Sequence, residues 1–461
     1  MKSTLVSYQS LVNARRWDFE YFDPEYQAII DSIENSGWQV YKLGKIVNSL
    51  TDGQHGYLVH LSEGIPLLRT TNIFENEIKL DDVRYIAPEV HSEIKRSQLK
   101  PGDVLLTTIG SLGIAAVVDS SLGEANINQN LVKMTPKPEI NSLYLSLFLN
   151  SNLGKVQTQR TASKSVVPII NYSRLKEIVV PVPPRSLQDQ IAQVMQEAYR
   201  DRQKKLQQAE QSYQKVIDYV FEQLGINLER TQRKRNALVP ISVLQGGRFD
   251  FEAVVTVQDI SSQFAEHETT LLEEVVEQTN ERITPSIDSP DEVVNYIGLA
   301  NIQSHTGELA NFEPVQGKEI LSSSPKFAKG DILFGRMRPY LNKVWIAEFD
   351  GICSGEALIF RPNKNKVDTQ FLHTLLLSQL TLDQVVPLQS GSSLPRVSAS
   401  DVLSVKLPVP KDLQKQQEIG NEVKKRRSEA KRLRSEAEAV VAAAKARVER
   451  MILGEEEIEE N

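Results

Sequence analysis

The chain has 461 residues, a formal net charge of -7 at pH 7, one cysteine and six histidines. Its hydrophobic fraction of 40% and charged fraction of 25% are those of an ordinary globular protein. No run reaches the roughly 18 consecutive apolar residues of a membrane span, and the first residues lack the apolar core of a signal peptide. The lone Cys353 excludes an intramolecular disulfide framework and, with so few histidines, argues against a structural zinc site. We expect a cytoplasmic protein, and the negative charge alone does not exclude DNA as a partner.

The first half of the chain has the pattern of a mixed α and β domain. A helix-like segment at residues 23–38 precedes the apolar runs IPLLRTTNI, GDVLLTT, IAAVVD and NLVKMTP, which lie between turn-forming residues. Such short bounded runs are strand signals. Residues 142–156 follow, and their leucines recur at the spacing of a helix. We therefore predict an α+β domain over residues 1–184, with antiparallel strands.

The second half repeats the first at an offset of about 227 to 232 residues. Gly102-Asp103 returns as Gly330-Asp331, Pro181 returns as Pro408, and RRWDFEY returns as GRFDFEA. The strand signals YIGLANI, GDILFG, KVWIAEF and EALIFRP follow, and then a leucine-rich helical patch. This period is too long for a solenoid, whose repeats run about 20 to 50 residues. We predict a second domain of the same kind over 236–410, and a partner with two related halves.

A long helical pattern follows each domain, over residues 185–235 and 411–461. Apolar residues recur at steps of three and four for about five heptads, with charged residues between them. The seam positions are Leu206, Tyr213 and Val220 in the first helix and Leu433, Val440 and Val448 in the second. Either helix alone could lie on its own domain. Two matching stripes favour an antiparallel coiled coil, in which about 36 residues would span about 54 Å and hold the domains apart.

The order of these segments resembles the specificity subunits of type I restriction-modification systems. The resemblance rests on TDGQHG, PLLRTTNI, GDVLLTTIGSLG and VPVPPRSLQDQIA, on their duplication, and covers about residues 17–453. It implies that each domain is a target-recognition domain that reads one half of a bipartite, asymmetric DNA site. It also implies that the helices set the gap and dock two methyltransferase subunits, with restriction subunits beside them. In the second copy TDGQHG has no clear equivalent, and IGSLG becomes GRMRPYLNKV.

The motifs of the relevant enzymes do not occur in the sequence. There is no D/N-P-P-Y/F motif of an amino-methyltransferase, no glycine-rich cofactor loop and no phosphate loop of an ATP-driven motor. Paired carboxylates such as Glu273-Glu274 are better explained as a solvated helix face. We therefore expect a non-catalytic chain that holds no cofactor or metal, with S-adenosylmethionine, ATP and Mg²⁺ in partner subunits.

Three places in each half carry side chains suited to DNA contact. Base edges are read by Arg, Lys, Asn, Gln, Ser and Thr on loops. The first-half candidates are Thr107, Thr108 and Ser111, then Asn128, Gln129 and Asn130, then Arg160, Lys164 and Ser165. The second-half candidates are Arg336 and Arg338, then Ser354 with Glu356, then Ser392, Ser393 and Arg396. Any single Asn or Ser could instead cap a turn. Arg336 and Arg338 are the strongest candidates, because arginine on guanine is the commonest specific contact.

Two other functions stay open at this point. The chain could be a coiled-coil adaptor whose duplicated domains bind proteins without sequence-specific DNA contact. It could also be the recognition subunit of a related phage-defence complex that methylates without cutting. Neighbouring genes for an adenine methyltransferase and a helicase-type nuclease would separate these alternatives.

Overall fold

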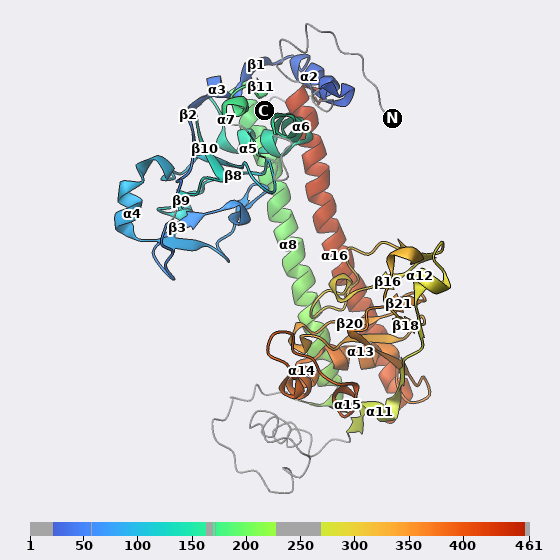
Figure 1. Ribbon diagram of the computed structural model, residues 1–461. Helices are drawn as coiled ribbons and strands as arrows, with labels where there is room; N and C mark the ends of the chain where they lie inside the picture. Colours follow the sequence, from blue (N-terminus) through green and yellow to red (C-terminus); the bar gives the residue numbers. More distant parts are fainter. Residues whose placement is uncertain (1–21, 57, 163–168, 171, 227–268, 457–461) are drawn as a thin grey trace. The chain divides into compact units, whose positions relative to one another are not determined.

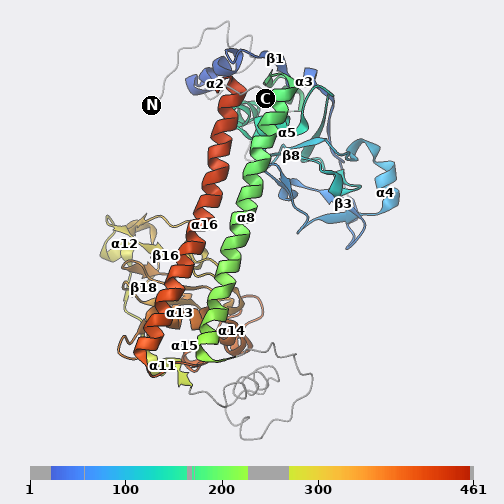
Figure 2. The same cartoon turned by 180° about the vertical axis from the view of Figure 1, so that it is seen from behind.

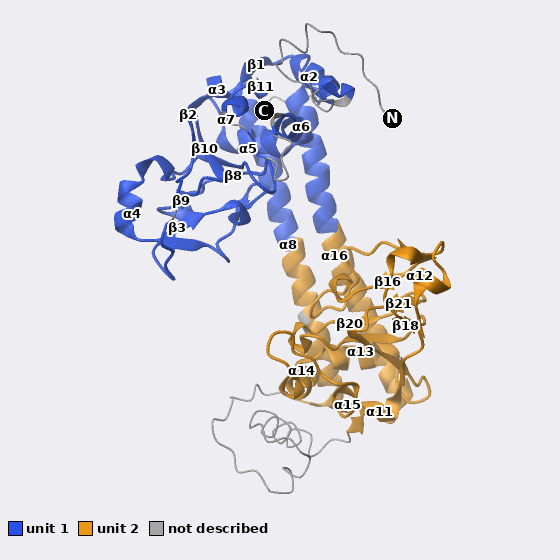
Figure 3. Cartoon of the chain, viewed as in Figure 1, with its two compact units in different colours: residues 1–204, 436–461 blue, residues 205–435 orange. Residues whose placement is uncertain are grey.

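The computed structural model describes residues 22–456 apart from residues 57, 163–168, 171 and 227–268. The chain forms two compact units, which are coloured separately in Figure 3. Unit 1 consists of residues 1–204 and 436–461, and unit 2 consists of residues 205–435. Each of the long helices α8 (Arg185–Leu224) and α16 (Leu413–Leu453) contributes one part to each unit. No helix among the described residues is long and apolar enough to cross a membrane.

Unit 1 is built around the four-stranded antiparallel sheet β2-β10-β7-β8 (Figure 1). Its strands are β1 (Gln39–Lys42), β2 (Val47–Asp52), β3 (Ile65–Leu68), β4 (Ile73–Phe74), β5 (Glu77–Ile78), β6 (Arg84–Ile86), β7 (Val104–Thr107), β8 (Ala115–Val117), β9 (Asn126–Ile127), β10 (Leu131–Pro136) and β11 (Val179–Val182). Its short helices are α2 (Pro24–Glu34), α3 (Leu43–Ile46), α4 (Pro88–Glu93), α5 (Ser142–Asn150), α6 (Asn152–Thr161) and α7 (Tyr172–Leu175). Smaller sheets pair β1 with β11 and order β6-β3-β9.

Unit 2 repeats this plan around the sheet β13-β22-β19-β20. Its strands are β12 (Thr270–Leu271), β13 (Val276–Thr279), β14 (Arg282–Ile283), β15 (Val293–Val294), β16 (Tyr296–Ile297), β17 (Val315–Gln316), β18 (Ser324–Phe327), β19 (Ile332–Gly335), β20 (Val344–Ile346), β21 (Gly351–Cys353), β22 (Ala357–Pro362) and β23 (Lys406–Leu407). Its short helices are α11 (Leu272–Val275), α12 (Pro285–Asp288), α13 (Thr369–Leu377), α14 (Gln379–Val385) and α15 (Ala399–Leu403). The mixed α and β fold predicted for both halves is confirmed. The expectation of antiparallel strands holds for both central sheets but is wrong for β3-β9 and β16-β21, which are parallel.

One inner strand of each four-stranded sheet, β7 in unit 1 and β19 in unit 2, is apolar on both faces because both faces are buried. In β7, Val104 and Leu106 belong to the core that packs on α5, whereas Leu105 belongs to the core on the opposite face. Strand β19 repeats the alternation, since Ile332 faces one core and Leu333 faces the other. Successive side chains of a strand point to opposite faces, so a strand covered on both sides reads as a continuous apolar run.

The repeated Gly-Asp pair forms the turn before this inner strand. Gly102 and Gly330 have φ values of 87° and 95°, a left-handed conformation that glycine adopts without a side-chain clash. The buried Asp103 carboxylate accepts the backbone N–H of Lys100 at 2.9 Å, and Asp331 makes the same contact one repeat later at 2.8 Å. The motif therefore closes a turn in both units.

A buried glutamine attaches each long helix to its domain. The backbone N–H of Asn141 donates to Oε1 of Gln188 at 2.8 Å, and Nε2 of Gln188 donates to the Pro183 carbonyl at 2.9 Å. Gln416, which lies 228 residues later, makes the same two contacts at 2.9 Å and 2.7 Å. Both glutamines are at most 1% exposed. This bonding explains why the Pro-rich motif and the glutamine after it recur together.

The long helices pack together inside each unit. In unit 1, Ile191 of α8 and Val448 of α16 belong to one core. In unit 2, Val220 and Val423 share another, to which α13 also contributes, and α13 lies beside this part of α16 in both views (Figures 1 and 2). A continuous coiled coil along both helices stays a prediction. The spacer helix predicted over 185–235 is described to Leu224, and residues 227–235 lie outside the described residues.

Candidate nucleic-acid interface

Three segments of unit 2 that are far apart in sequence meet at the end of β19. The backbone N–H of Arg336 donates to the Glu356 carbonyl at 2.9 Å, and the N–H of Val397 donates to the Arg336 carbonyl at 3.1 Å. Arg396 also forms a bridge with Met337. We call this meeting point of residues 335–342, 354–357 and 390–397 junction 2. It brings together the three predicted DNA-contact places of the second half.

Unit 1 builds the same meeting point with the same backbone hydrogen bonds. The N–H of Thr108 donates to the Asn130 carbonyl at 3.0 Å, and the N–H of Ile170 donates to the Thr108 carbonyl at 3.0 Å. Ile169 bridges to Ile109 as Arg396 does to Met337. We call the meeting point of residues 107–114, 128–131 and 169–170 junction 1. Thr108, Asn130 and Ile169 thus occupy the places that Arg336, Glu356 and Arg396 occupy in junction 2.

Junction 2 carries four charged side chains, and two of them, Arg396 and Glu356, bind each other. The Arg396 guanidinium binds both Glu356 carboxylate oxygens at 2.8 to 3.1 Å and donates a further hydrogen bond to the Leu394 carbonyl. The hydrogen bond from Arg396 holds the pKa of Glu356 below its usual value, and the charge of Arg336 contributes. Arg338 differs from these residues, because its side chain is exposed. In junction 2, Arg338 therefore points outward from loops that the Arg396–Glu356 ion pair holds together.

The hydroxyls of junction 1 hold its own turn. Thr107 is buried, donates to the Ser111 carbonyl and accepts the N–H of Ile114 at 2.9 Å. Thr108 is 6% exposed and donates to the Asn130 carbonyl at 3.0 Å. We correct their assignment on this ground, because buried hydroxyls already bonded to backbone have no face toward a ligand. Ser111 itself is exposed on the same turn.

The remaining candidates divide into outward-facing residues and turn caps. Gln129, Ser392 and Ser393 are exposed, whereas Asn128 and Ser354 use their side-chain oxygens to accept a nearby backbone N–H at 3.2 Å. Arg160 lies near the end of α6 and is half-buried, while Lys164 and Ser165 lie outside the described residues. The outward-facing candidates thus lie at the tips of turns. Asn128 and Ser354 instead hold their own turns through these hydrogen bonds.

The TDGQHG motif adds a group to junction 1 that the candidate set omitted. A Cβ on Gly53 would lie 2.2 Å from the Asn128 carbonyl oxygen, so only glycine fits this approach. The next residue, Gln54, bridges to Asn128, and the exposed His55 ring lies 2.6 Å from the Asp52 carboxylate. The two glycines of the motif, Gly53 and Gly56, were the available signal in the sequence. They place a polar turn beside junction 1.

The predicted seam positions fall into two classes. Tyr213, Val220 and Val448 are buried, and Leu206, Leu433 and Val440 are half-buried. Tyr213 also donates its hydroxyl to the Thr306 carbonyl at 2.8 Å, and burial raises its pKa to about 12. In unit 2 the helices run antiparallel where they meet, because Arg434 lies 3.7 Å from Glu210 while Arg426 stacks over Tyr219.

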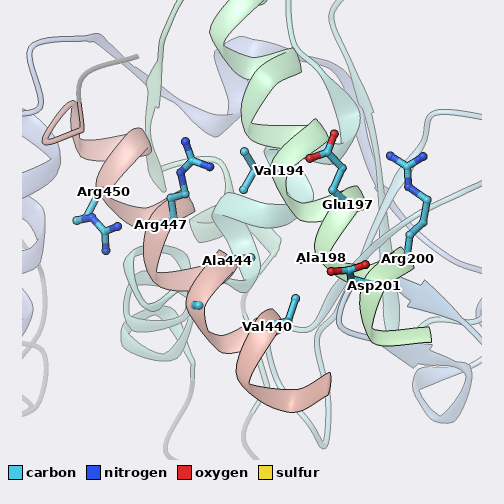
Figure 4. Close-up of a pocket in the computed structure, with 10 residues that line it drawn as sticks. Val194, Glu197, Ala198, Arg200, Asp201, Val440, Ala444, Arg447 and Arg450 are labelled. Atoms are coloured by element: carbon cyan, nitrogen blue, oxygen red, sulfur yellow. The ribbon is translucent and has the colours of Figure 1, made fainter. Parts of the chain in front are cut away.

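An open groove lies between α8 and α16 within unit 1 (Figure 4). It has a volume of about 780 Å³, an apolar floor that includes Val194, Ala198 and Ala444, and charged residues at its rim. In unit 2 the repeat places Arg426 where unit 1 has Ala198. Arg426 lies 4.3 Å from the Tyr219 ring centre. The two units therefore differ in the surface their helices expose.

No three His, Cys, Asp or Glu side chains gather as a metal site would require in the part of the chain that the structure describes. Junction 1 presents neutral polar side chains, such as Ser111 and Gln129, and junction 2 presents the cationic Arg338. Such groups suit contact with base edges and phosphates.

Comparison with known proteins gives a consistent set of relatives. The family model of the type I restriction modification DNA specificity domain matches residues 35–211 and 266–428, which is most of the chain. The EcoDI specificity subunit of Escherichia coli is 33% identical over 143 residues, and the EcoBI specificity subunit of the same organism is 25% identical over 170 residues. The first match spans 31% of each chain and the second 36% of each, so the chain matches about a third of the length of these relatives.

A solved structure shares the fold. A chain from a structural study of complex assembly and conformational transition in the type I restriction-modification system matches with a TM-score of 0.50 and 12% identity, covering 90% of this chain and 97% of that one. The duplicated domains, the paired matches of the family model and this likeness agree. The chain belongs to the type I restriction-modification DNA specificity family.

Proposed function

We propose that the chain is the DNA-reading subunit of a type I restriction-modification assembly. Junction 1 reads one half of a bipartite, asymmetric sequence and junction 2 reads the other. Helices α8 and α16 set the gap between the halves. The chain itself catalyses no reaction.

One observation carries this proposal. The two junctions share their backbone hydrogen bonds, but Thr108, Asn130 and Ile169 are replaced by Arg336, Glu356 and Arg396. A frame repeated with different side chains on it, with Gly110 in one junction and the exposed Arg338 in the other, fits a protein that reads two different half-sequences, because base identity is read by side chains at groove edges. A protein-binding adaptor gives no reason for this pattern of divergence.

Partner subunits supply the chemistry in this proposal. Two adenine methyltransferase subunits dock on the long helices, for which the groove beside Ala198 and Ala444 offers one surface. They bring S-adenosylmethionine, and restriction subunits bring ATP and Mg²⁺. We place the assembly in the cytoplasm.

The ruler role of the helices is tested by inserting four residues after Gln208, an exposed position of α8. One helical turn adds about 6 Å, which corresponds to one or two base pairs at about 3.4 Å each. We expect methylome sequencing of cells that carry the chain and its partners to show a gap longer by that amount, with both half-sequences unchanged.

A variant with alanine at Gln207 and Gln208, both exposed, controls for local damage without a change of length and should keep the original motif. New half-sequences at an unchanged gap would contradict the ruler role. A complex that methylates without any sequence preference would contradict the proposed function as a whole.

A further inference from the structure

Arg338 occupies a backbone conformation that normally belongs to glycine. Its φ and ψ are 51° and 61°, in the left-handed region. The equivalent residue of junction 1, two positions after Thr108 as Arg338 is two after Arg336, is Gly110, with a φ of 79°. In L-residues this conformation brings Cβ close to the following carbonyl, and glycine avoids that strain. Unit 2 therefore carries an arginine where unit 1 has the unstrained residue.

The surrounding backbone holds the strained turn in place. The N–H of Arg338 donates to the Pro395 carbonyl at 2.7 Å, and its carbonyl accepts the N–H of Leu341 at 2.9 Å. The neighbouring Met337 bridges to Arg396, which Glu356 grips with both carboxylate oxygens. Glu356 thus acts as a positioning residue for the loop that carries Arg338.

Within the described residues, no interaction of the Arg338 side chain offsets the energy of its strained backbone. The side chain is exposed, and no residue in the described ranges forms a hydrogen bond or ion pair with its guanidinium. Glu356, the one carboxylate among the residues of junction 2, forms an ion pair with Arg396. Strained non-glycine residues of this kind concentrate at functional sites, where the strain positions a group for a ligand.

We infer that Arg338 reads a guanine in the half-site of unit 2, from a turn that is strained so as to present it. The inference rests on the proposed function and names the base pair that junction 2 selects. A guanidinium can donate two hydrogen bonds to O6 and N7 of guanine, which requires a fixed orientation. A phosphate contact would gain little from the bracing by Pro395 and Glu356. Gly110 leaves junction 1 without this contact.

The test replaces Arg338 in the complete complex with its methyltransferase partners. We expect Arg338→Gly to raise or preserve the unfolding temperature, because glycine relieves the strain, while discrimination for one G·C pair in one half-site falls at least tenfold. Arg338→Lys should retain overall affinity, since the charge remains, and lose the same discrimination. The readouts are thermal unfolding, and binding or methylation of a set of sites that vary one base pair at a time.

Asn311→Gly is the matched control, because Asn311 is an exposed residue of unit 2 with a φ of 50° and no charge to lose. It should leave the recognised motif unchanged. Equal weakening on all sequences after Arg338→Gly would assign Arg338 to phosphate and overturn the inference, as would an unchanged motif. A wild-type complex without sequence preference would instead reject the proposed function.

Discussion

Junction 1 and junction 2 share one backbone frame and differ in the side chains placed on it. At the equivalent positions the first has Thr108 and Gly110, and the second has Arg336 and Arg338. The backbone hydrogen bonds of the frame are the same in both junctions although the side chains differ, and in junction 1 the hydroxyls of Thr107 and Thr108 add further hydrogen bonds. The two copies therefore keep the same backbone frame and differ in the side chains that this frame presents.

The same division runs through the rest of both units. The turn aspartates, the buried glutamines Gln188 and Gln416, and some apolar helix positions, such as Val220 and Val448, are shared. Some buried polar positions differ between the units, as where unit 2 has His373 and unit 1 has Ser146. Substitutions at shared positions should therefore have equal effects in the two units, and substitutions at divergent positions should affect one unit.

The largest effect is expected from a buried charge in the helix seam. Val220 of unit 2 and Val448 of unit 1 are 0% and 3% exposed and lie 228 residues apart. Val220→Asp and Val448→Asp should each reduce the free energy of unfolding by about 4 kcal/mol, because each removes apolar packing and buries a carboxylate. Denaturant unfolding with hydrogen exchange on each unit measures this. The half-buried Leu206, changed to Asp, should cost less; equal losses at all three positions would contradict the assigned burial.

Loss of the buried glutamine should have the next largest effect, and it should be the same in both units. Gln188→Ala and Gln416→Ala each leave a backbone N–H and carbonyls without their partner, which costs about 1 to 3 kcal/mol. Thermal unfolding of the two single variants gives the comparison. The exposed Gln193→Ala, also in α8, serves as a control that should change little. A large loss in one unit alone would show that the two helix attachments are not equivalent.

The smallest effect concerns pH and should separate the units. His373 of α13 donates Nε2–H to the Val344 carbonyl at 2.9 Å and accepts a hydrogen bond from Arg427 of α16. Burial, and then the charge of Arg427, lower its pKa well below the usual value. The unfolded chain binds a proton below about pH 6.5 that the folded chain rejects, so the stability of unit 2 should fall as pH drops from about 6.5 toward the folded pKa.

Unit 1 has Ser146 at the equivalent place, and it donates to Asn76 at 2.8 Å. Hydrogen exchange at pH 7.5 and 5.5 should therefore show loosening around α13 that has no counterpart around α5. His373→Gln, which keeps a donor and an acceptor but does not titrate in this range, should remove the difference. Its persistence in that variant would assign the pH response to another group.

Much of the architecture follows from local patterns in the sequence. The apolar runs predicted β3, β7, β8 and β10 in unit 1 and β16, β19, β20 and β22 in unit 2, and the leucine-rich patches predicted α5 and α13, because these elements depend on residues near in the chain. The shorter strands between them were not predicted. The parallel pairs β3-β9 and β16-β21 were missed, because strand direction depends on how distant segments come together. Thr107 and Thr108 were misjudged for a similar reason: a hydroxyl in a turn looks available until the fold buries it.

The sequence alone determined the duplication, the mixed fold, the long helices and the resemblance to a family, since each is written in spacing and residue type along one chain. Only the tertiary structure showed that three separated segments meet at each junction, that Glu356 is occupied by Arg396, and that Arg338 stands in a glycine's conformation. Those facts depend on contacts between residues up to about sixty positions apart and on backbone angles. Neither is set by composition or periodicity, because a side chain's role depends on what the folded chain places next to it.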